Sequence, residues 1–73
     1  MPKLYSSKHI IKVLENKGFI FVKQKGSHMK YRKKGNPVLT VIVPAAKKEI
    51  PTGTFVSILR QANLNAVDFE KKK

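Results

Sequence analysis

Apolar positions in the first part of the chain recur at the spacing of an α-helix. Within residues 7–17, four aliphatic side chains fall on one helical face: Ile10, Ile11, Val13 and Leu14. Ser6 or Ser7 offers a capping hydroxyl at the start, and Gly18 accepts the left-handed conformation that ends a helix. The pattern therefore predicts an amphipathic helix over residues 7–17.

Three short β-prone segments follow this helix. Phe19–Lys23 is rich in aromatic and β-branched residues, His28–Arg32 alternates between two sets of side chains, and Val38–Val43 is the most β-prone stretch. Gln24–Ser27 and Lys33–Pro37 carry the turn residues that separate them. The sequence therefore predicts three consecutive strands joined by short turns.

Apolar residues return to helical spacing after a loop over residues 45–53. The helical set is Phe55, Ile58, Leu59 and Ala62. Thr52 or Thr54 is placed to cap this helix, and Asn65 is placed to cap a short turn that reaches Phe69. We expect a helix that ends near residue 62, then a short helical turn, then a frayed tail over residues 71–73.

The elements occur in the order helix, three meandering strands, helix and short turn. This order predicts an α+β fold in which two helices cover one face of an antiparallel sheet and leave the other face open. Because the chain has 73 residues, with no internal repeat and no linker, we expect a single domain over residues 1–73. An open sheet face suits a flat or extended ligand.

The charge of the chain points to a kind of partner. Lys and Arg number 16 against 4 Asp and Glu, which gives a formal net charge of +12, while a hydrophobic fraction of 41% supports a compact fold. Such an excess favours a polyanion, above all the phosphates of nucleic acid. Without cysteine, a signal peptide or a membrane-spanning segment, the protein is expected in the cytoplasm, with no membrane partner.

The cations are concentrated in one part of the chain. Residues 17–34 contain seven basic residues and no acidic one: Lys17, Lys23, Lys25, Lys30, Arg32, Lys33 and Lys34. The strand pattern puts His28, Lys30 and Arg32 on one face, beside Lys23 and Lys25 of the previous strand and its turn. An edge strand protected by lysine is the structural alternative, but the charge of the whole chain favours a nucleic-acid surface.

His9 and His28 are the two side chains that ordinarily titrate near neutral pH. His9 falls in the first turn of the predicted helix, where a simple surface role is expected. His28 follows Gly26 and Ser27 and has cationic neighbours, so it is a candidate general base or a phosphate contact. Ser27 either hydrogen-bonds a phosphate or closes the turn.

Conventional catalytic sets are missing from the sequence. The four carboxylates, Glu15, Glu49, Asp68 and Glu70, are scattered, and two histidines without cysteine predict no metal site and no cofactor. Cleavage of RNA requires fewer catalytic groups, because the 2′-hydroxyl of RNA is an internal nucleophile that needs only one base and stabilising cations. The sequence therefore suits cleavage of RNA better than cleavage of DNA.

Phe21 and Tyr31 could stack on bases, as aromatic residues do in RNA-binding sheets. A small core, however, needs its aromatic residues. We expect both side chains to pack under the helices.

Motifs along nearly the whole chain together resemble the HicA toxin family. They are Gly18-Phe19, Gln24-Lys25-Gly26-Ser27-His28, Tyr31-Arg32, Val41-Ile42-Val43-Pro44, Lys48-Glu49-Ile50, Pro51-Thr52-Gly53-Thr54 and Ser57-Ile58-Leu59-Arg60-Gln61-Ala62. The segment Lys-Gly-Ser-His followed by Tyr31 is the specific part when it is combined with the later Ile-Leu-Arg-Gln-Ala.

The resemblance implies a double-stranded-RNA-binding-domain-like fold, ribosome-independent cleavage of mRNA, and inhibition by a cognate HicB antitoxin. It places the family's catalytic histidine at His28. We therefore expect a toxin that is a metal-independent mRNA endoribonuclease, with no small-molecule cofactor. The expected RNA-binding residues are Lys23, Lys25, Gly26, Ser27, Lys30, Arg32, Lys47 and Lys48.

One departure from the resemblance concerns a second histidine. Many relatives have one after the proline that follows the third strand, whereas here Pro44 precedes Ala45-Ala46-Lys47-Lys48. Protonation of the leaving group is then left to water, to a lysine or to no specific group. Two other interpretations stay open: a noncatalytic nucleic-acid-binding module, and a basic domain that docks an acidic protein.

Overall fold

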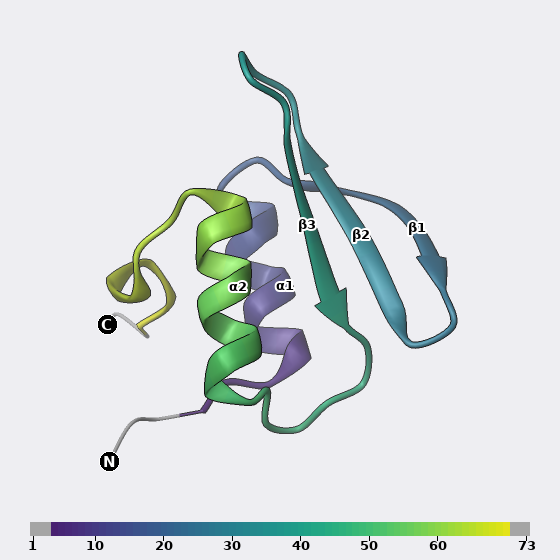
Figure 1. The fold of residues 1–73 in the computed structure, drawn as a ribbon, viewed down its shortest axis with the longest axis vertical. Coiled ribbons are helices and arrows are strands. Elements are labelled where there is room, and N and C mark those ends of the chain that lie inside the picture. Colours follow the sequence, from purple (N-terminus) through teal and green to yellow (C-terminus); the bar gives the residue numbers. More distant parts are fainter. Residues whose placement is uncertain (1–3, 71–73) are drawn as a thin grey trace.

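The computed structural model describes residues 4–70, and the chain runs from a helix through a three-stranded sheet to a second helix and a 3₁₀ turn (Figure 1). The elements are α1 (Ser7–Asn16), β1 (Ile20–Lys25), β2 (His28–Lys33), β3 (Leu39–Pro44), α2 (Thr52–Ala62) and η1 (Ala66–Phe69). This is the predicted α+β arrangement. The tail predicted to fray, residues 71–73, lies outside the described residues.

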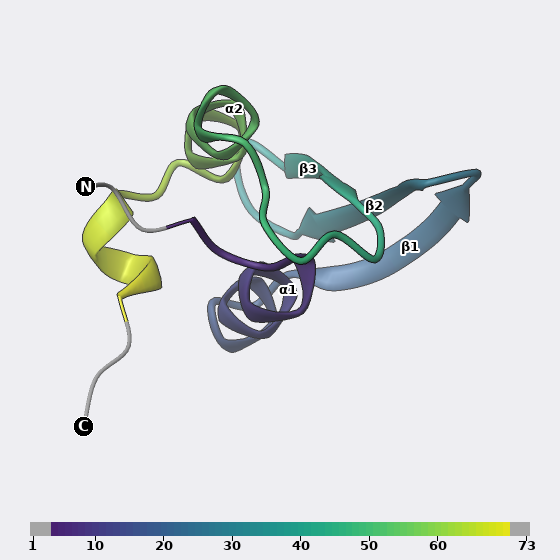
Figure 2. The ribbon, with the colours of Figure 1, turned by 90° about the horizontal axis from the view of Figure 1, so that it is seen from below.

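The sheet has the order β1-β2-β3, and both pairs of strands are antiparallel. Figure 2 shows α1 and α2 on the same side of the curved sheet. One face of the sheet therefore packs against the helices, and the other faces solvent.

Among residues 4–70, neither helix has the length and apolar character needed to span a bilayer.

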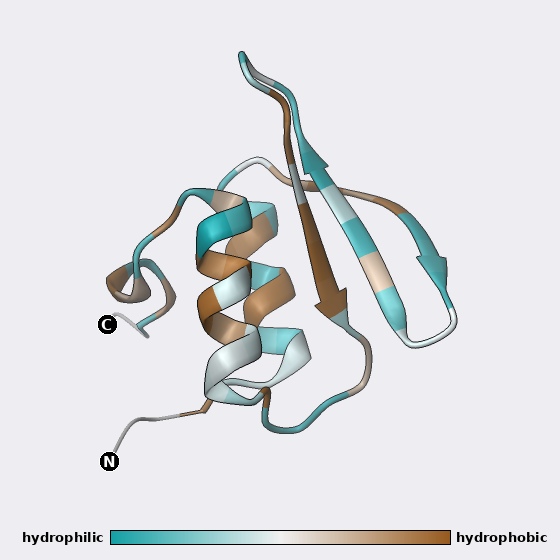
Figure 3. Ribbon diagram, viewed as in Figure 1, coloured by the Kyte–Doolittle hydropathy of each residue, from teal (hydrophilic) through white to brown (hydrophobic). Residues whose placement is uncertain are grey.

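The core forms where the helices meet the sheet. Its ten buried apolar residues come from every element except β1: Ile10, Leu14, Phe19, Tyr31, Val41, Val43, Ile50, Ile58, Ala62 and Phe69. Figure 3 shows the same contrast, with β3 strongly hydrophobic and β2 mostly hydrophilic. Because a fully buried aliphatic side chain contributes about 1.5–3 kcal/mol, β3 is the strand that fastens the sheet to the helices.

Five predicted strand boundaries were wrong by one or two residues, and among them β1 begins at Ile20 instead of Phe19 and β2 extends to Lys33. β1 continues through Gln24 and Lys25, so the turn to β2 contains only Gly26 and Ser27. The turn is this short because Gly26 has φ +59°, as a two-residue hairpin turn requires at its first position. β3 excludes Val38 and includes Pro44, which is tolerated because it is the last residue of an outer strand.

The ends of the helices confirm one predicted cap and correct another. The Ser6 hydroxyl accepts a hydrogen bond from the His9 N–H at 3.1 Å, and α1 ends before Gly18, whose φ is +100°. The predicted threonine cap of α2 was wrong, since the helix begins directly after Pro51 with no side-chain cap. The Pro51 carbonyl accepts from the Phe55 N–H at 2.9 Å, which places both threonines inside the first turn.

The two aromatic residues of the hairpin have different environments. Tyr31 is only 4% exposed, as predicted, and its burial raises the pKa of the phenol, with the Glu15 carboxylate adding to the rise. Phe21 was expected in the core but is 51% exposed. Its ring forms a T-shaped pair with that of Tyr31 at a centroid distance of 5.7 Å, yet β1 lies too far along the sheet for a helix to cover it.

Gly26 and Gly53 allow a matched test of the hairpin turn. A Cβ at either position would meet no atom within 4 Å, but only Gly26 has a positive φ. We expect Gly26→Ala to lower the free energy of unfolding by about 1 kcal/mol through backbone strain. Gly53→Ala should raise it by up to about 1 kcal/mol, because alanine is the better helix former. Urea denaturation measures both, and equal effects would contradict the role of Gly26.

Candidate nucleic-acid interface

The open face of the sheet is defined by three cross-strand rows. Lys25, His28 and Pro44 pair in the first row, Lys23, Lys30 and Ile42 in the second, and Ile20, Arg32 and Thr40 in the third. Paired residues in an antiparallel sheet point to the same face, and Tyr31, which alternates with Lys30 and Arg32, is buried on the other one. Within the three described strands, the open face thus carries four cations, one histidine and no carboxylate.

This arrangement confirms that His28, Lys30 and Arg32 share a face with Lys23 and Lys25. Phe21 and Tyr31 form a pair on the opposite face, so no aromatic side chain of the described strands lies on the open one. The open face therefore offers charge and hydrogen bonds to a ligand, and not the stacking platform that was considered from the sequence.

The turn that precedes His28 is fixed by hydrogen bonds, and the His28 side chain is exposed. It is the first residue of β2, directly after the Gly26-Ser27 turn. The Gln24 amide donates to the Gly26 carbonyl at 2.8 Å, and the Ala45 N–H donates to the Ser27 carbonyl at 2.7 Å. Within residues 4–70 the imidazole makes no hydrogen bond, so no carboxylate orients it and both ring nitrogens can reach a ligand.

Ser7 ties the loop after β3 to the start of α1. Its hydroxyl donates to the Pro44 carbonyl at 2.6 Å and accepts from the Lys47 N–H at 3.0 Å, while its own N–H donates to the Lys47 carbonyl at 2.9 Å. The side chain is buried, with 3% of the residue exposed. Since Pro44 is the cross-strand partner of His28, Ser7 fixes the end of the sheet where the histidine lies.

From the sequence, Ser7 was predicted only as an alternative to Ser6 for the cap of the first helix. A signal was present, because Ser7, Ile10 and Leu14 are spaced as one helical face and all three are buried. A small polar residue on an apolar helical face must find hydrogen-bond partners inside the protein. Which groups they would be depended on the path of the later loop.

Lys47 and Lys48 are not on the open face of the sheet. They line a shallow hollow beside the start of α1, together with Ser6, Ser7, Lys8, Ile11 and Ala46. The loop reaches the His28 end of the sheet, because Pro44 and Ala45 are bound to β2 and its turn, and then bends away toward α1. These two lysines therefore form a second basic group with Lys8.

His9 has a structural role that the sequence did not reveal. Its Nε2 lies 2.6 Å from the Phe69 carbonyl oxygen, which can only accept, so this nitrogen is the donor. The imidazole also stacks on the Tyr5 ring, with centroids 4.8 Å apart. His9 thus joins α1 to η1 and is partly buried, instead of lying free on the surface.

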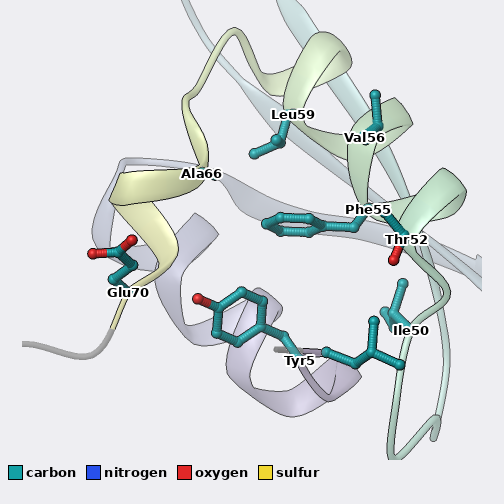
Figure 4. A pocket seen from close by; sticks show the side chains of 9 residues that line it. Tyr5, Ile50, Thr52, Phe55, Val56, Leu59, Ala66 and Glu70 are labelled. Atoms are coloured by element: carbon teal, nitrogen blue, oxygen red, sulfur yellow. The ribbon is translucent and has the colours of Figure 1, made fainter. Parts of the chain in front are cut away.

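The pocket in Figure 4 lies between the helices, and His28 is not among the residues that line it. It is lined by Leu4, Tyr5, Ile50, Thr52, Phe55, Val56, Leu59, Ala66 and Glu70. Its walls are mostly apolar and offer one carboxylate. Among residues 4–70 no group of three or more His, Asp or Glu side chains is arranged to hold a metal ion. The exposed basic sheet face is therefore the stronger candidate site.

Comparison with known protein families places this chain in a class of bacterial toxins. A model of the family described as the HicA toxin of bacterial toxin–antitoxin systems matches residues 7–64, which run from the start of α1 past the end of α2. The chain therefore belongs to the HicA toxin family. A search of curated proteins found no match to the chain.

Ser7→Ala tests whether the buried hydroxyl holds the loop beside His28. We expect the free energy of unfolding to fall by about 1–3 kcal/mol, because the Lys47 N–H and the Pro44 carbonyl lose a buried partner. Hydrogen exchange at the Lys47 amide should accelerate as well. Ser57→Ala, at an exposed position of α2, is the control and should change stability little. Equal losses in the two variants would contradict the role of Ser7.

Proposed function

We propose that this toxin is a metal-independent endoribonuclease that cleaves mRNA, with His28 as the general base. The observation that carries the proposal is the position of an exposed histidine in a sheet face that holds four cations and no carboxylate. An RNA backbone fits such a face, because cations replace the counterions of the phosphates and the histidine can reach a ribose hydroxyl.

The proposed reaction needs one proton acceptor and a stabilised phosphate. The neutral His28 imidazole takes the proton of a ribose 2′-hydroxyl, and the resulting oxygen attacks the adjacent phosphorus. The bond from phosphorus to the 5′-oxygen of the next nucleotide then breaks, leaving a 2′,3′-cyclic phosphate and a 5′-hydroxyl. The leaving oxygen takes its proton from water or from a lysine.

The cations of the open face would stabilise the charge that develops on the phosphate. Lys25 and Lys30 are the nearest candidates, since Lys25 is paired with His28 and Lys30 is two residues further along the same face. Lys23 and Arg32 extend the basic surface along the strands and would hold the flanking backbone. Gly26 and Ser27 allow a phosphate to approach the turn closely, and Ser27 adds a hydroxyl donor.

Lys47 and Lys48 are proposed as contacts to a more distant part of the RNA. They lie beside α1 with Lys8 and not among the sheet cations, so the scissile phosphate is better served by Lys25 and Lys30. An RNA strand that passes His28 and follows the loop after β3 would reach them next.

Membership of the HicA family implies an antitoxin partner. We propose that this partner is a HicB-type protein whose acidic surface covers the open face and His28. Electrostatic complementarity to a chain of net charge +12 would make the capture fast.

Cleavage of a labelled mRNA in excess EDTA tests the catalytic proposal. We expect the wild type to give 2′,3′-cyclic ends, and His28→Ala to be slower by about 10²–10⁴-fold, the usual contribution of a general base. His9→Gln is the control histidine variant and should retain cleavage, although it should be less stable. Circular dichroism establishes that each variant is folded.

A substrate with a 2′-deoxyribose at the cleaved linkage checks the nucleophile. It should bind and remain intact. Equal cleavage by His28→Ala, or cleavage at the deoxy linkage, would contradict the mechanism. Binding without any products from the folded wild type would favour the noncatalytic nucleic-acid-binding module.

The salt dependence of RNA binding tests whether the RNA lies on the open face. With an RNA blocked at its 2′-hydroxyls, Lys30→Gln should reduce the slope of log K against log salt by about 0.7, because one phosphate contact is lost. Lys12→Gln, at an exposed position of α1, should leave the slope unchanged. Equal slopes for both variants would place the RNA elsewhere, and no binding at low salt would favour a protein-interaction domain.

A further inference from the structure

The two edge strands of the sheet, β3 and β1, have different surroundings. At the outer edge of β3, α2 packs beside the strand and its Gln61 side-chain oxygen accepts a hydrogen bond from the Ile42 N–H at 2.9 Å. On the other side, β1 ends the sheet, and all six of its residues are exposed. Within residues 4–70 the outward backbone groups of β1 have no strand or helix beside them, as Figure 1 shows. A row of unpaired N–H and C=O groups can accept another strand.

The side chains at this edge are unusually apolar for a solvent-exposed strand. Ile20, Phe21 and Val22 follow one another and are 60%, 51% and 38% exposed. Strand register puts Ile20 on the open face and Phe21 on the helical face, with a bulge between Phe21 and Lys23. Apolar surface is therefore presented on both sides of the same edge. Contiguous exposed apolar residues of this kind mark interaction sites.

The charges beside the edge specify what would bind there. Lys23 and Lys25 lie on the open face of β1, and Phe21 lies on its opposite face. We infer that the β1 edge is a docking site for an extended segment of an acidic protein partner, which adds a fourth strand to the sheet. A segment that alternates acidic and apolar residues would place its carboxylates beside the two lysines and its apolar side chains beside Phe21.

A second copy of this chain fits the edge poorly. Pairing β1 with its own copy would bring Lys23 and Lys25 together with the same lysines of another chain that also has a net charge of +12. Like charges that face each other across strands are destabilising, and lysines on an edge strand oppose self-association for this reason. RNA fits less well too, because it lacks the alternating amide groups that would satisfy the backbone of β1.

The inference concerns the edge of β1 and does not require cleavage of RNA. Its link to the proposed antitoxin rests on the proposed function, since such a protein would have to carry the acidic segment. Binding of a strand and cleavage of RNA can be measured separately, and His28→Ala separates them. This variant is expected to lose cleavage and to bind a strand as the wild type does.

The test uses the full chain, labelled with ¹⁵N, and a short blocked peptide in which glutamate alternates with valine. We expect the amide signals of residues 20–25 to shift and the outward amides of β1 to exchange more slowly with solvent. Phe21→Ser should weaken peptide binding about tenfold through loss of apolar contact. Val67→Ser, at a position in η1 that is also 51% exposed, should not change it.

Two control peptides decide whether a strand is added. A peptide with lysine in place of glutamate should fail to bind, and so should one whose central valine is replaced by proline. If Phe21→Ser does not fold, Ile20→Ser replaces it. No binding by the acidic peptide, equal binding by the proline peptide, or shifts confined to β2 and β3 would overturn the inference. So would concentration-dependent dimerisation of the wild type that Phe21→Ser abolishes, because the occupant would then be a second copy.

Discussion

The register of β2 is the constraint on which the rest of the structure depends. Along this strand, Met29 and Tyr31 face the helices, while His28, Lys30 and Arg32 face solvent. Because side chains alternate with a period of two, a slip of one residue would bury the cations and expose the apolar set. The large energy of burying unpaired charge therefore holds the register, and the two-residue turn at Gly26 sets it locally. The chemistry of the open face follows directly from the packing of the core.

The same constraint explains which features could be predicted from the sequence. The helical spacing of Ile10 and Leu14, and the alternation in β2, depend only on neighbouring residues, and they correctly gave the element order and the shared face of His28 and Lys30. The exposure of Phe21 could not be read in this way, because it depends on how far the helices reach across the sheet. Its residue type and strand pattern are the same whether or not a helix covers it.

Contacts between distant segments were also beyond local patterns. The Ser7 hydroxyl binds a loop about forty residues away, and His9 binds the carbonyl of Phe69. Both residues were interpreted from their places in a single helix, where capping and surface exposure are the usual roles. Lys47 and Lys48 look equivalent to the strand lysines in the sequence, but the Ser7 contacts draw their loop toward α1. The positions of these side chains depend on how distant segments of the chain pack together in the folded protein.

Two lysines belong both to the open face of the sheet and to the β1 edge. Lys23 and Lys25 belong to the open face proposed for RNA, and they also flank the β1 edge proposed for an acidic strand. A partner that adds carboxylates beside these lysines would neutralise cations of the proposed RNA-binding face, even where it makes no contact with His28. Because exposed cations act on a polyanion jointly, losing two of the four on this face would weaken RNA binding substantially. Inhibition could thus arise at the edge of the sheet, through electrostatics, as well as by covering the histidine itself.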